Sequence, residues 1–333
     1  MDFGGQAAAF SWIFGGITGK SACMAKPLNS YTAPIGELQV QQLREILEER
    51  GFEFGTKEWA IFAAKKGKLN VTVYEKGPKV LVQGKETEDF VKFILEPEVL
   101  GEAKIGYEEV NQPEMFTAHF GIDESGKGDF FGPLVIAGAY TDAEIARHLI
   151  DAGVTDSKRI TSDAKIRKLA GIIRDTPGMV SEVVRIGPTR YNDLYARFRN
   201  LNRMLAWGHA LVIEGLLGKK PDCPRALSDQ FANPREIERA LMEKGRGIEL
   251  QQRTKAESDV AVAAASILAR EAFIDWLRDA RDNLGFELPK GASAQVKEVG
   301  REIAQRHGAE GLGKVAKMHF KTANEILAKI SQD

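Results

Sequence analysis

Two acids, a lysine and several glycines lie together in the stretch GIDESGKGDFFGPL, residues 121–134, and two chemistries are open to them. The spacing from Gly121 to Lys127 approaches that of a phosphate-binding P-loop, G-x-x-x-x-G-K-[ST]. Asp123 and Glu124, in contrast, carry the oxygen ligands that a hard divalent metal ion prefers. The first interpretation predicts a nucleotide hydrolase, and the second predicts metal-dependent cleavage of a nucleic-acid strand.

The P-loop interpretation fails at two positions. The residue after the glycine and lysine must be Ser or Thr, because its hydroxyl binds Mg²⁺, and here it is Gly128. A P-loop also needs a helix N-terminus beneath the phosphates, whereas DFFGPLVIAG runs through Gly132 and Pro133 into a strand.

Asp123 and Glu124 are adjacent, and adjacent residues of a regular strand face opposite sides of the sheet. We expect a break at Ser125 and Gly126 to let the second acid turn back toward the first. The glycines also allow the backbone to approach a ligand closely. A polar strand end followed by a tight turn is the alternative interpretation.

Two further acids lie next to apolar segments and are candidate ligands of the same metal ion. Asp229 ends the short run RALSD, although a strand-terminal acid can equally cap the next helix, in NPREIERAL. Glu257 is expected at the start of a helix over 254–270, where Thr254 and Glu257 also fit a capping box. The small face of that helix predicts a close helix–sheet contact: Ala261, Ala264, Ala265 and Leu268. Each acid alone is ambiguous, but together they supply enough carboxylates for a divalent ion.

The side chains available argue against zinc and favour Mg²⁺ or Mn²⁺. The five histidines show no metal-ligand spacing, and we interpret them as scattered surface or core residues: His119, His148, His209, His307 and His319. Cys23 and Cys223 are far apart with no pairing pattern, which predicts a reduced, cytoplasmic location. Carboxylates plus substrate phosphate are the usual ligands of Mg²⁺ and Mn²⁺.

Length and composition predict a soluble protein of two domains, or of one large domain with an appendage. The chain has 333 residues, 43% hydrophobic and 28% charged, with a net charge of -1, so that any basic surface must be local. The apolar run 7–19 has no preceding lysine or arginine and is too short to cross a membrane. We expect residues 1–29 to be a disordered leader, with Met24 as a candidate true start.

Residues 30–100 are predicted to form a small α+β domain. Apolar spacing indicates helices over 36–50 and 87–99, and turn residues separate three strand-like runs over 59–66, 69–77 and 79–84. Lysines gather around these strands: Lys65, Lys66, Lys68, Lys76 and Lys79. They fit either a solvated edge or a face that contacts phosphates.

A polar, Gly- and Pro-containing linker is expected over 101–114, followed by the larger domain over 115–333. Its first two strands, within MFTAHFGID and LVIAGAYTD, are expected to pair as a hairpin. The later apolar runs 179–187 and 225–231 are separated by helical stretches such as 201–218. This order predicts a mixed α/β sheet with helices on its faces.

Several separated motifs, in order, resemble the bacterial ribonuclease HIII family. They are DESGKGDFFGPLVIA, VTDSKR, YNDLY…NLNRMLAWGHA, SDQF, KAESDVAVAAASILAR and KMHFKT, within a resemblance that covers roughly residues 30–330. Lys127 between two glycines, Glu257, and the N-terminal module favour this type over ribonuclease HII. The resemblance implies a ribonuclease H-like fold with a TATA-box-binding-protein-like N-terminal domain that helps to hold the substrate.

The resemblance also implies an activity and its residues. The activity is cleavage of the RNA strand of RNA–DNA hybrids with two Mg²⁺ or Mn²⁺ ions, leaving 5′-phosphate and 3′-hydroxyl ends. The implied catalytic and metal-binding acids are Asp123, Glu124, Asp229 and Glu257, whereas Asp259 matches no family acid. The implied substrate contacts are the Ser125, Gly126, Lys127 and Gly128 turn, then Lys158, and more weakly Asn200 and Asn202, which also fit capping roles.

Three alternatives stay open. The protein is a ribonuclease HII-like enzyme that cuts at single embedded ribonucleotides, a hybrid-binding protein without catalysis, or a nucleotide hydrolase. The four acids argue against the second, and Gly128 argues against the third. We expect a monomer without an obligate protein partner and without membrane attachment.

Overall fold

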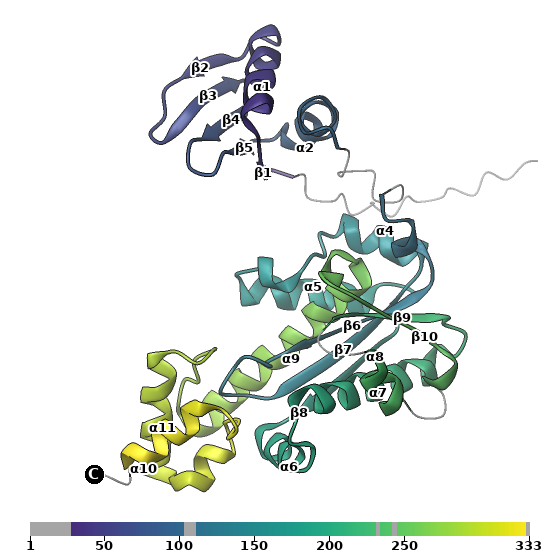
Figure 1. Ribbon diagram of the computed structural model, residues 1–333, viewed down its shortest axis with the longest axis vertical. Helices are drawn as coiled ribbons and strands as arrows, with labels where there is room; N and C mark the ends of the chain where they lie inside the picture. Colours follow the sequence, from purple (N-terminus) through teal and green to yellow (C-terminus); the bar gives the residue numbers. More distant parts are fainter. Residues whose placement is uncertain (1–27, 103–110, 231–233, 242–244, 331–333) are drawn as a thin grey trace, which may run out of the picture.

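The computed structural model describes residues 28–102, 111–230, 234–241 and 245–330 (Figure 1). The leader expected before Met24 and most of the expected linker therefore lie outside the described residues. Within the described part of the chain, no helix combines the length and the apolar character needed to cross a membrane.

The described strands form two five-stranded sheets. The first has the order β1-β5-β4-β3-β2 and the second has the order β10-β9-β6-β7-β8. The strands of the first sheet are β1 (Ser30–Pro34), β2 (Glu53–Gly55), β3 (Ala60–Lys66), β4 (Leu69–Tyr74) and β5 (Lys79–Gln83). Those of the second are β6 (His119–Ser125), β7 (Leu134–Thr141), β8 (Ser181–Ile186), β9 (Arg225–Asp229) and β10 (Glu249–Arg253).

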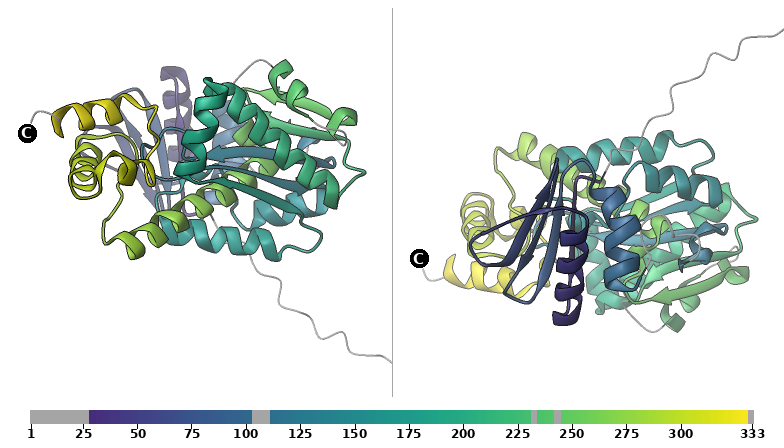
Figure 2. Two further views of the ribbon diagram at one scale, coloured as in Figure 1. Left: turned by 90° about the horizontal axis from the view of Figure 1, so that it is seen from below. Right: turned by 90° about the horizontal axis from the view of Figure 1, so that it is seen from above.

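The first sheet is antiparallel and buries one face against its own helices. Valines alternate along β4 and β5, so that Val71, Val73, Val80 and Val82 all point to a core shared with Leu43 of α1. The helices over this core are α1 (Glu37–Glu49), α2 (Thr87–Phe90) and the π-helical segment η1 (Val91–Leu100). Figure 2 shows α1 and η1 side by side, where Gln42 Nε2 donates to the carbonyl oxygen of Glu98 at 2.6 Å.

The three strands predicted in this region are confirmed, but the sheet has two more. β1 contains Pro34, and all three residues of β2 are exposed. Neither segment therefore shows the long alternation of apolar and polar residues that marks a strand in a sequence.

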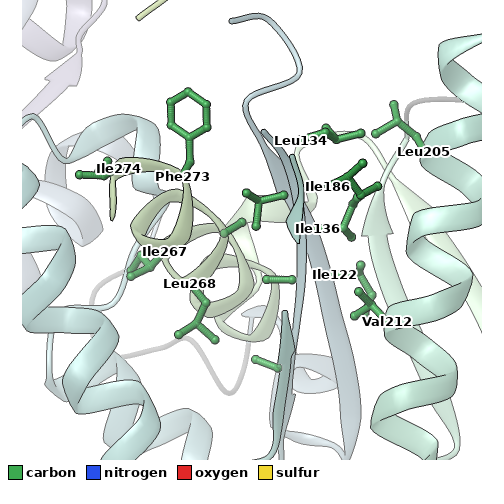
Figure 3. Packing of buried hydrophobic residues seen from close by; sticks show 14 of the residues in the cluster. Ile122, Leu134, Ile136, Ile186, Leu205, Val212, Ile267, Leu268, Phe273 and Ile274 are labelled. Atoms are coloured by element: carbon green, nitrogen blue, oxygen red, sulfur yellow. The ribbon is translucent and has the colours of Figure 1, made fainter. Parts of the chain in front are cut away.

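Helices cover both faces of the second sheet, as predicted. β6 and β7 form the expected antiparallel hairpin, β8 continues it, and β9 pairs parallel to β6. Every residue of β7 is buried, as expected for a central strand between two helical layers. Figure 3 shows Ile267 and Leu268 of α9 on one side of the sheet, and Ile122, Ile136 and Val212 on the side of α7.

The helices of this larger unit follow in chain order. They are α4 (Ala143–Asp151), α5 (Asp163–Asp175), α6 (Pro188–Phe198), α7 (Leu201–Lys219), α8 (Pro234–Ala240), α9 (Val260–Leu284), α10 (Ala294–Gly313) and α11 (Lys321–Ile330). Short 3₁₀ turns are η2 (Pro113–Phe116), η3 (Ser157–Arg159), η4 (Gly245–Gly247) and η5 (Ala256–Ser258).

The predicted close contact of the alanine-rich helix with the sheet is confirmed. α9 packs so tightly on β6 that a Cβ atom on Gly121 would lie 2.1 Å from the backbone carbon of Ala261. Only glycine fits there, because the obstructing atoms belong to backbone that cannot rotate away. This contact fixes the level of α9 along β6 and therefore the position of the segment that precedes the helix.

Candidate active site

Asp123 and Asp229 lie side by side at the ends of two neighbouring strands. β6 and β9 are parallel, with Gly121 opposite Leu227 and Ile122 opposite Ser228. The next step of this register places Asp123 beside Asp229. In α/β sheets, ligands bind at the carboxyl ends of such strands.

Both aspartates face α9. Gly121 contacts Ala261 of that helix, and side chains two residues apart on a strand share a face, which places Asp123 on the same side. Asp229 occupies the equivalent position on β9. The hydrogen bond between Asp123 and Ser266 of α9 agrees with this orientation.

Glu124 points to the opposite face, contrary to the expected break in the strand. Pairing of β6 with β7 stays regular, with Glu124 opposite Ile136 and Ser125 opposite Val135. The Glu124 side chain consequently faces α7, where its Oε2 lies 3.2 Å from Nε2 of His209. Its Oε1 accepts a hydrogen bond of 3.3 Å from Nζ of Lys127. The strand thus separates the two adjacent acids instead of uniting them.

The two adjacent acids differ in their electrostatic surroundings. Burial and the charge of Glu124 raise the pKa of Asp123 to about 7, although hydrogen bonds and the charge of Lys158 oppose the rise. Burial also acts to raise the pKa of Glu124, but His209 and Lys127 outweigh it and the pKa lies below its ordinary value. The charge of Lys158 thus does not offset the burial of Asp123 and the charge of Glu124, and a bound cation would add the missing compensation.

Lys158 lies in the field of the predicted acids. It is exposed on η3, and Asp156 Oδ1 accepts a hydrogen bond from its backbone amide at 3.0 Å. Burial of part of the side chain acts to lower the pKa of Lys158, yet four surrounding carboxylates raise it above its ordinary value: Asp123, Glu257, Asp156 and Asp229. The structure thus brings Lys158 close to three of the four predicted acids.

The segment that carries Lys158 is anchored to α9. The hydroxyls of Ser157 and Ser266 lie 2.6 Å apart in the interior, and Arg270 donates to the carbonyl oxygen of Ser157. Because Ser266 also bonds Asp123, one serine of α9 connects the buried aspartate to the loop with the lysine.

Glu257 precedes α9 by one short turn, so the predicted helix start over 254–270 is wrong. Glu257 lies in η5, and the first helical residue is Val260. The expected capping box of Thr254 and Glu257 is also wrong, because Asp259 caps the helix and accepts from the amides of Ala261 and Val262. Glu257 instead lines a cavity of about 350 Å³ together with Asp156, Arg159 and Lys255.

The glycine turn follows directly after Ser125 at the end of β6. Gly126 has a φ of 84°, and a Cβ atom there would lie 2.2 Å from the carbonyl oxygen of Pro133. The turn therefore folds back closely on the residues that lead into β7, and only glycine permits that approach. Lys127 and Gly128 complete the turn at the edge of the sheet where Asp123 lies.

Asn200 and Asn202 have the positions of a helix start. Asn200 caps α7, with its Oδ1 accepting from the backbone amide of Arg203 at 3.2 Å. Asn202 is exposed in the first turn of the same helix. The capping alternative accounts for Asn200, and substrate contact by either residue stays a prediction.

Two of the histidines that were interpreted as scattered surface or core residues are buried, and each has a specific partner. His209 contacts Glu124, and Nε2 of the buried His119 lies 3.0 Å from Oδ1 of Asp259. His209 lies on the buried face of the motif NLNRMLAWGHA. Its place in that motif is the one feature of the sequence that could have pointed to a role for this histidine. Neither partner is near in the chain, so spacing alone does not reveal these pairs.

The carboxylates fit a magnesium or manganese ion by their chemistry, but not as a preformed cage. Among the described residues, no three His, Cys, Asp or Glu side chains are grouped closely enough to hold a metal ion. Mg²⁺ is commonly held by one or two carboxylates plus substrate phosphates. Asp123 and Asp229 match that smaller ligand set.

The comparisons with known proteins agree with this fold and site. The sequence model of the family described as Ribonuclease HII matches residues 120–323, which defines the larger unit as a ribonuclease of that class. Ribonuclease HIII of Protochlamydia amoebophila (strain UWE25) is 43% identical over 292 residues, covering 88% of this chain and 95% of the relative. Ribonuclease HIII of Chlamydia pneumoniae is 44% identical over 286 residues, covering 85% and 93%. The chain belongs to the ribonuclease HIII family, whose members are ribonuclease H endonucleases.

Solved structures show the same architecture. Bst-RNase HIII in complex with Mn²⁺ superposes with a TM-score of 0.63 at 28% identity, over 91% of this chain and 100% of the other. Aquifex aeolicus RNase H3 gives a TM-score of 0.51 at 27% identity, over 87% and 100%. The ribonuclease H-like sheet and the small N-terminal domain are thus both present in this chain.

Proposed function

We propose that this protein cleaves the RNA strand of RNA–DNA hybrids in a divalent-metal-dependent reaction, leaving 5′-phosphate and 3′-hydroxyl ends. The observation that carries the proposal is the placement of Asp123 beside Asp229 at the carboxyl ends of β6 and β9. Family membership supports the reaction class, and the Mn²⁺ complex of Bst-RNase HIII supports a metal.

Asp123 and Asp229 are the proposed principal ligands, with the scissile phosphate completing the coordination of Mg²⁺ or Mn²⁺. Glu257 and Glu124 are the further proposed acids of a two-ion arrangement, and Glu124 acts from the position in which His209 holds its carboxylate. When bound, such ions supply an activated water and stabilise the leaving 3′-oxygen.

The chain's own residues position the nucleic acid around these acids. Lys158 is exposed beside three of the carboxylates and is the proposed contact to a phosphate of the cleaved strand. The turn of Ser125, Gly126, Lys127 and Gly128 presents backbone and one cation at the same sheet edge. We propose that it contacts the ribose at the cleavage point, where the 2′-hydroxyl distinguishes RNA from DNA.

The outer face of the N-terminal sheet is the proposed second contact to the hybrid. Pairing aligns a polar row across four strands: Ser30, Gln83, Asn70 and Lys65. These side chains donate hydrogen bonds to phosphate and sugar oxygens without reading sequence. Lys66, in contrast, donates to the carbonyl oxygen of Arg50 and has a structural role at the edge of the core.

The test is cleavage of an end-labelled RNA–DNA hybrid by the full chain in Mg²⁺ and in Mn²⁺. We expect strand cleavage that chelation by EDTA abolishes, and an at least 100-fold loss in Asp123→Asn and Asp229→Asn, with hybrid binding retained. Asp279→Asn on the exposed end of α9 is the matched control and should cleave normally. Normal turnover by either active-site variant, or cleavage in EDTA, would refute the proposal.

Cleavage at a single ribonucleotide embedded in DNA is a second candidate function. The match to the family described as Ribonuclease HII over residues 120–323 favours testing it. Duplexes that carry one ribonucleotide and duplexes that carry a run of ribonucleotides, compared at equal concentration, separate the two. We expect cleavage of the run to be faster, and a preference for the single ribonucleotide would reverse the assignment.

A further inference from the structure

A fully buried lysine holds the segment that follows the glycine turn. Lys317 lies between α10 and α11 and has no exposed surface, the only lysine in the buried interior among the described residues. Burying a cation is costly unless polar groups compensate for the lost water. The hydrogen-bond acceptors of its ammonium group all lie in one short loop, residues 129–132.

The Lys317 ammonium group is surrounded by backbone carbonyls. Its Nζ donates to the carbonyl oxygens of Asp129 at 2.8 Å and Gly132 at 2.7 Å, and to that of Phe131 at 3.4 Å. The ring of Tyr191 lies 5.6 Å away. Three donors on one nitrogen match three acceptors, which suits the charged form of lysine.

Backbone hydrogen bonds attach the same two segments. The amide of Lys317 donates to the carbonyl oxygen of Phe130 at 2.8 Å, and the amide of Gly132 donates to that of Val315 at 2.9 Å. Residues 129–132 thus lie against residues 315–317 as a two-stranded bridge, with the lysine side chain wrapped by the loop.

The clamped loop is continuous with the glycine turn. Residue 129 follows Gly128 directly, and the carbonyl oxygen of Pro133 lies under Gly126, where a Cβ atom would come within 2.2 Å. A shift of residues 129–133 therefore moves both ends of the turn. The acids are held differently, because β6, β9 and α9 position them without Lys317.

The other side of the clamp is anchored to α6. Asn192 Nδ2 donates to the carbonyl oxygens of Gly313 and Ala316, each at 3.0 Å, and its Oδ1 accepts from the amide of Met318 at 2.9 Å. One side chain thus fixes the backbone on both sides of Lys317. The backbone that carries Lys317 is therefore held in one position by Asn192.

We infer that Lys317 is a positioning residue for the turn that recognises the ribose, so that the C-terminal helical unit takes part in substrate discrimination. The part of the inference that concerns substrate discrimination rests on the proposed hybrid cleavage. The structural part, the dependence of the turn on Lys317, does not.

Lys317→Met tests the inference, since methionine fills the space of the stem and removes the three donors. In the full chain without substrate, amide hydrogen exchange should accelerate at least tenfold in residues 126–132, while the amides of β6, β9 and α9 keep their protection. With the hybrid, KM should rise about tenfold, and the preference for hybrid over DNA duplex in binding should fall. The Mn²⁺ concentration for half-maximal activity should stay unchanged.

Two further variants keep the test decisive. Lys297→Met removes a half-buried lysine of α10 that pairs with Glu325, and we expect it to match the wild type in every measurement. Lys317→Gln retains two donors and should give an intermediate effect. If the Lys317→Met protein does not fold, Lys317→Gln takes its place in the test.

Unchanged exchange in residues 126–132 overturns the inference, as does faster exchange there with an unchanged KM. Uniformly faster exchange across the domain shows a general structural role and overturns it as well. Failure of the wild type to cleave the hybrid refutes the proposed function instead, and the exchange result still decides whether Lys317 holds the turn.

Discussion

His209 on α7 contacts Glu124 on β6, with 3.2 Å between Nε2 and Oε2, whereas the preceding residue, Asp123, faces α9 on the other side of the sheet. The strand alternation that separates these two acids is undisturbed up to Ser125. His209 is buried, and it therefore fixes the Glu124 carboxylate at the end of the strand. The protein thus holds one acid with a histidine, whereas the charge of Lys158 only partly offsets the burial of its neighbour.

The contact between His209 and Glu124 predicts a specific defect in His209→Leu. Leucine removes the donor and leaves a nearly buried carboxylate with only Lys127, so hybrid cleavage should fall about 10–100-fold. His209→Gln keeps a donor and should recover part of the activity. Steady-state kinetics of both variants on the same hybrid provide the measurement, and equal activity in the two would rule out a positioning role.

Asp123→Asn should gain stability while it loses cleavage. Burial and the charge of Glu124 penalise the Asp123 carboxylate, as its pKa of about 7 indicates, and a neutral amide avoids that cost. In metal-free buffer at pH 8, the Tm of the variant should exceed that of the wild type by a few degrees. Added Mn²⁺ should stabilise only the wild type. Thermal unfolding with and without Mn²⁺ checks both statements.

His119 and Asp259 predict a large loss of stability from one substitution. Nδ1 of His119 lies 2.7 Å from the carbonyl oxygen of Thr117, and Nε2 lies 3.0 Å from Asp259. Both ring nitrogens of the buried His119 therefore lie within hydrogen-bond distance of an oxygen atom. His119→Leu removes this partner and leaves the buried Asp259 carboxylate with only the two backbone amides at the start of α9, which should cost about 1–3 kcal/mol in urea unfolding.

A surface pair supplies the control for that experiment. Arg44 and Glu48 are 3.1 Å apart on α1 with more than half of each side chain exposed. Arg44→Met should leave the free energy of unfolding almost unchanged, because exposed pairs contribute little. A comparable loss in both variants would show that His119 forms no special pair.

Lys317 predicts a pH dependence of stability with a definite sign. Burial lowers the pKa of Lys317 to about 7, with the charge of Asp129 opposing it, while a lysine in the unfolded chain keeps its proton to about pH 10.4. Between these values the unfolded state binds more protons, so stability rises with pH. The free energy of unfolding of the wild type relative to Lys317→Met should therefore increase from pH 7 to pH 10.

The titratable groups next to Lys317 do not obscure its effect on stability between pH 7 and pH 10. Burial and the charge of Lys317 lower the pKa of His319, and burial raises the pKa of Tyr191, so both titrate outside the range. Urea unfolding at four or five pH values gives the slope. A flat difference would show that the three carbonyls keep the pKa of Lys317 at its ordinary value.

Gly121→Ala should disrupt the contact between β6 and α9. The added Cβ would meet backbone atoms of Ala261 and Val262 at 2.1 and 2.2 Å, which forces the helix away from the strand. We expect a loss of about 1–3 kcal/mol or more in unfolding experiments. Activity should fall with it, since Glu257 and Ser266 move with the helix.

Local patterns in the sequence determined much of the secondary structure of this protein and which faces of it are buried. The alternation of valines in 69–84, the apolar spacing of 36–50 and the alanine face of 261–268 each bury a face against a neighbour, so they specify their own secondary structure. The order of motifs also identified the family and led to the proposal of Asp123 and Asp229 as metal ligands.

Only the tertiary structure decided which side chains meet. His209 is 85 residues from Glu124, and Lys317 is 188 residues from Asp129, so no spacing in the chain records either contact. The register of β6 against β7 decided that Glu124 faces away from Asp123. Such contacts depend on sheet order and helix packing, which follow from burial of apolar surface across the whole domain rather than from any short stretch.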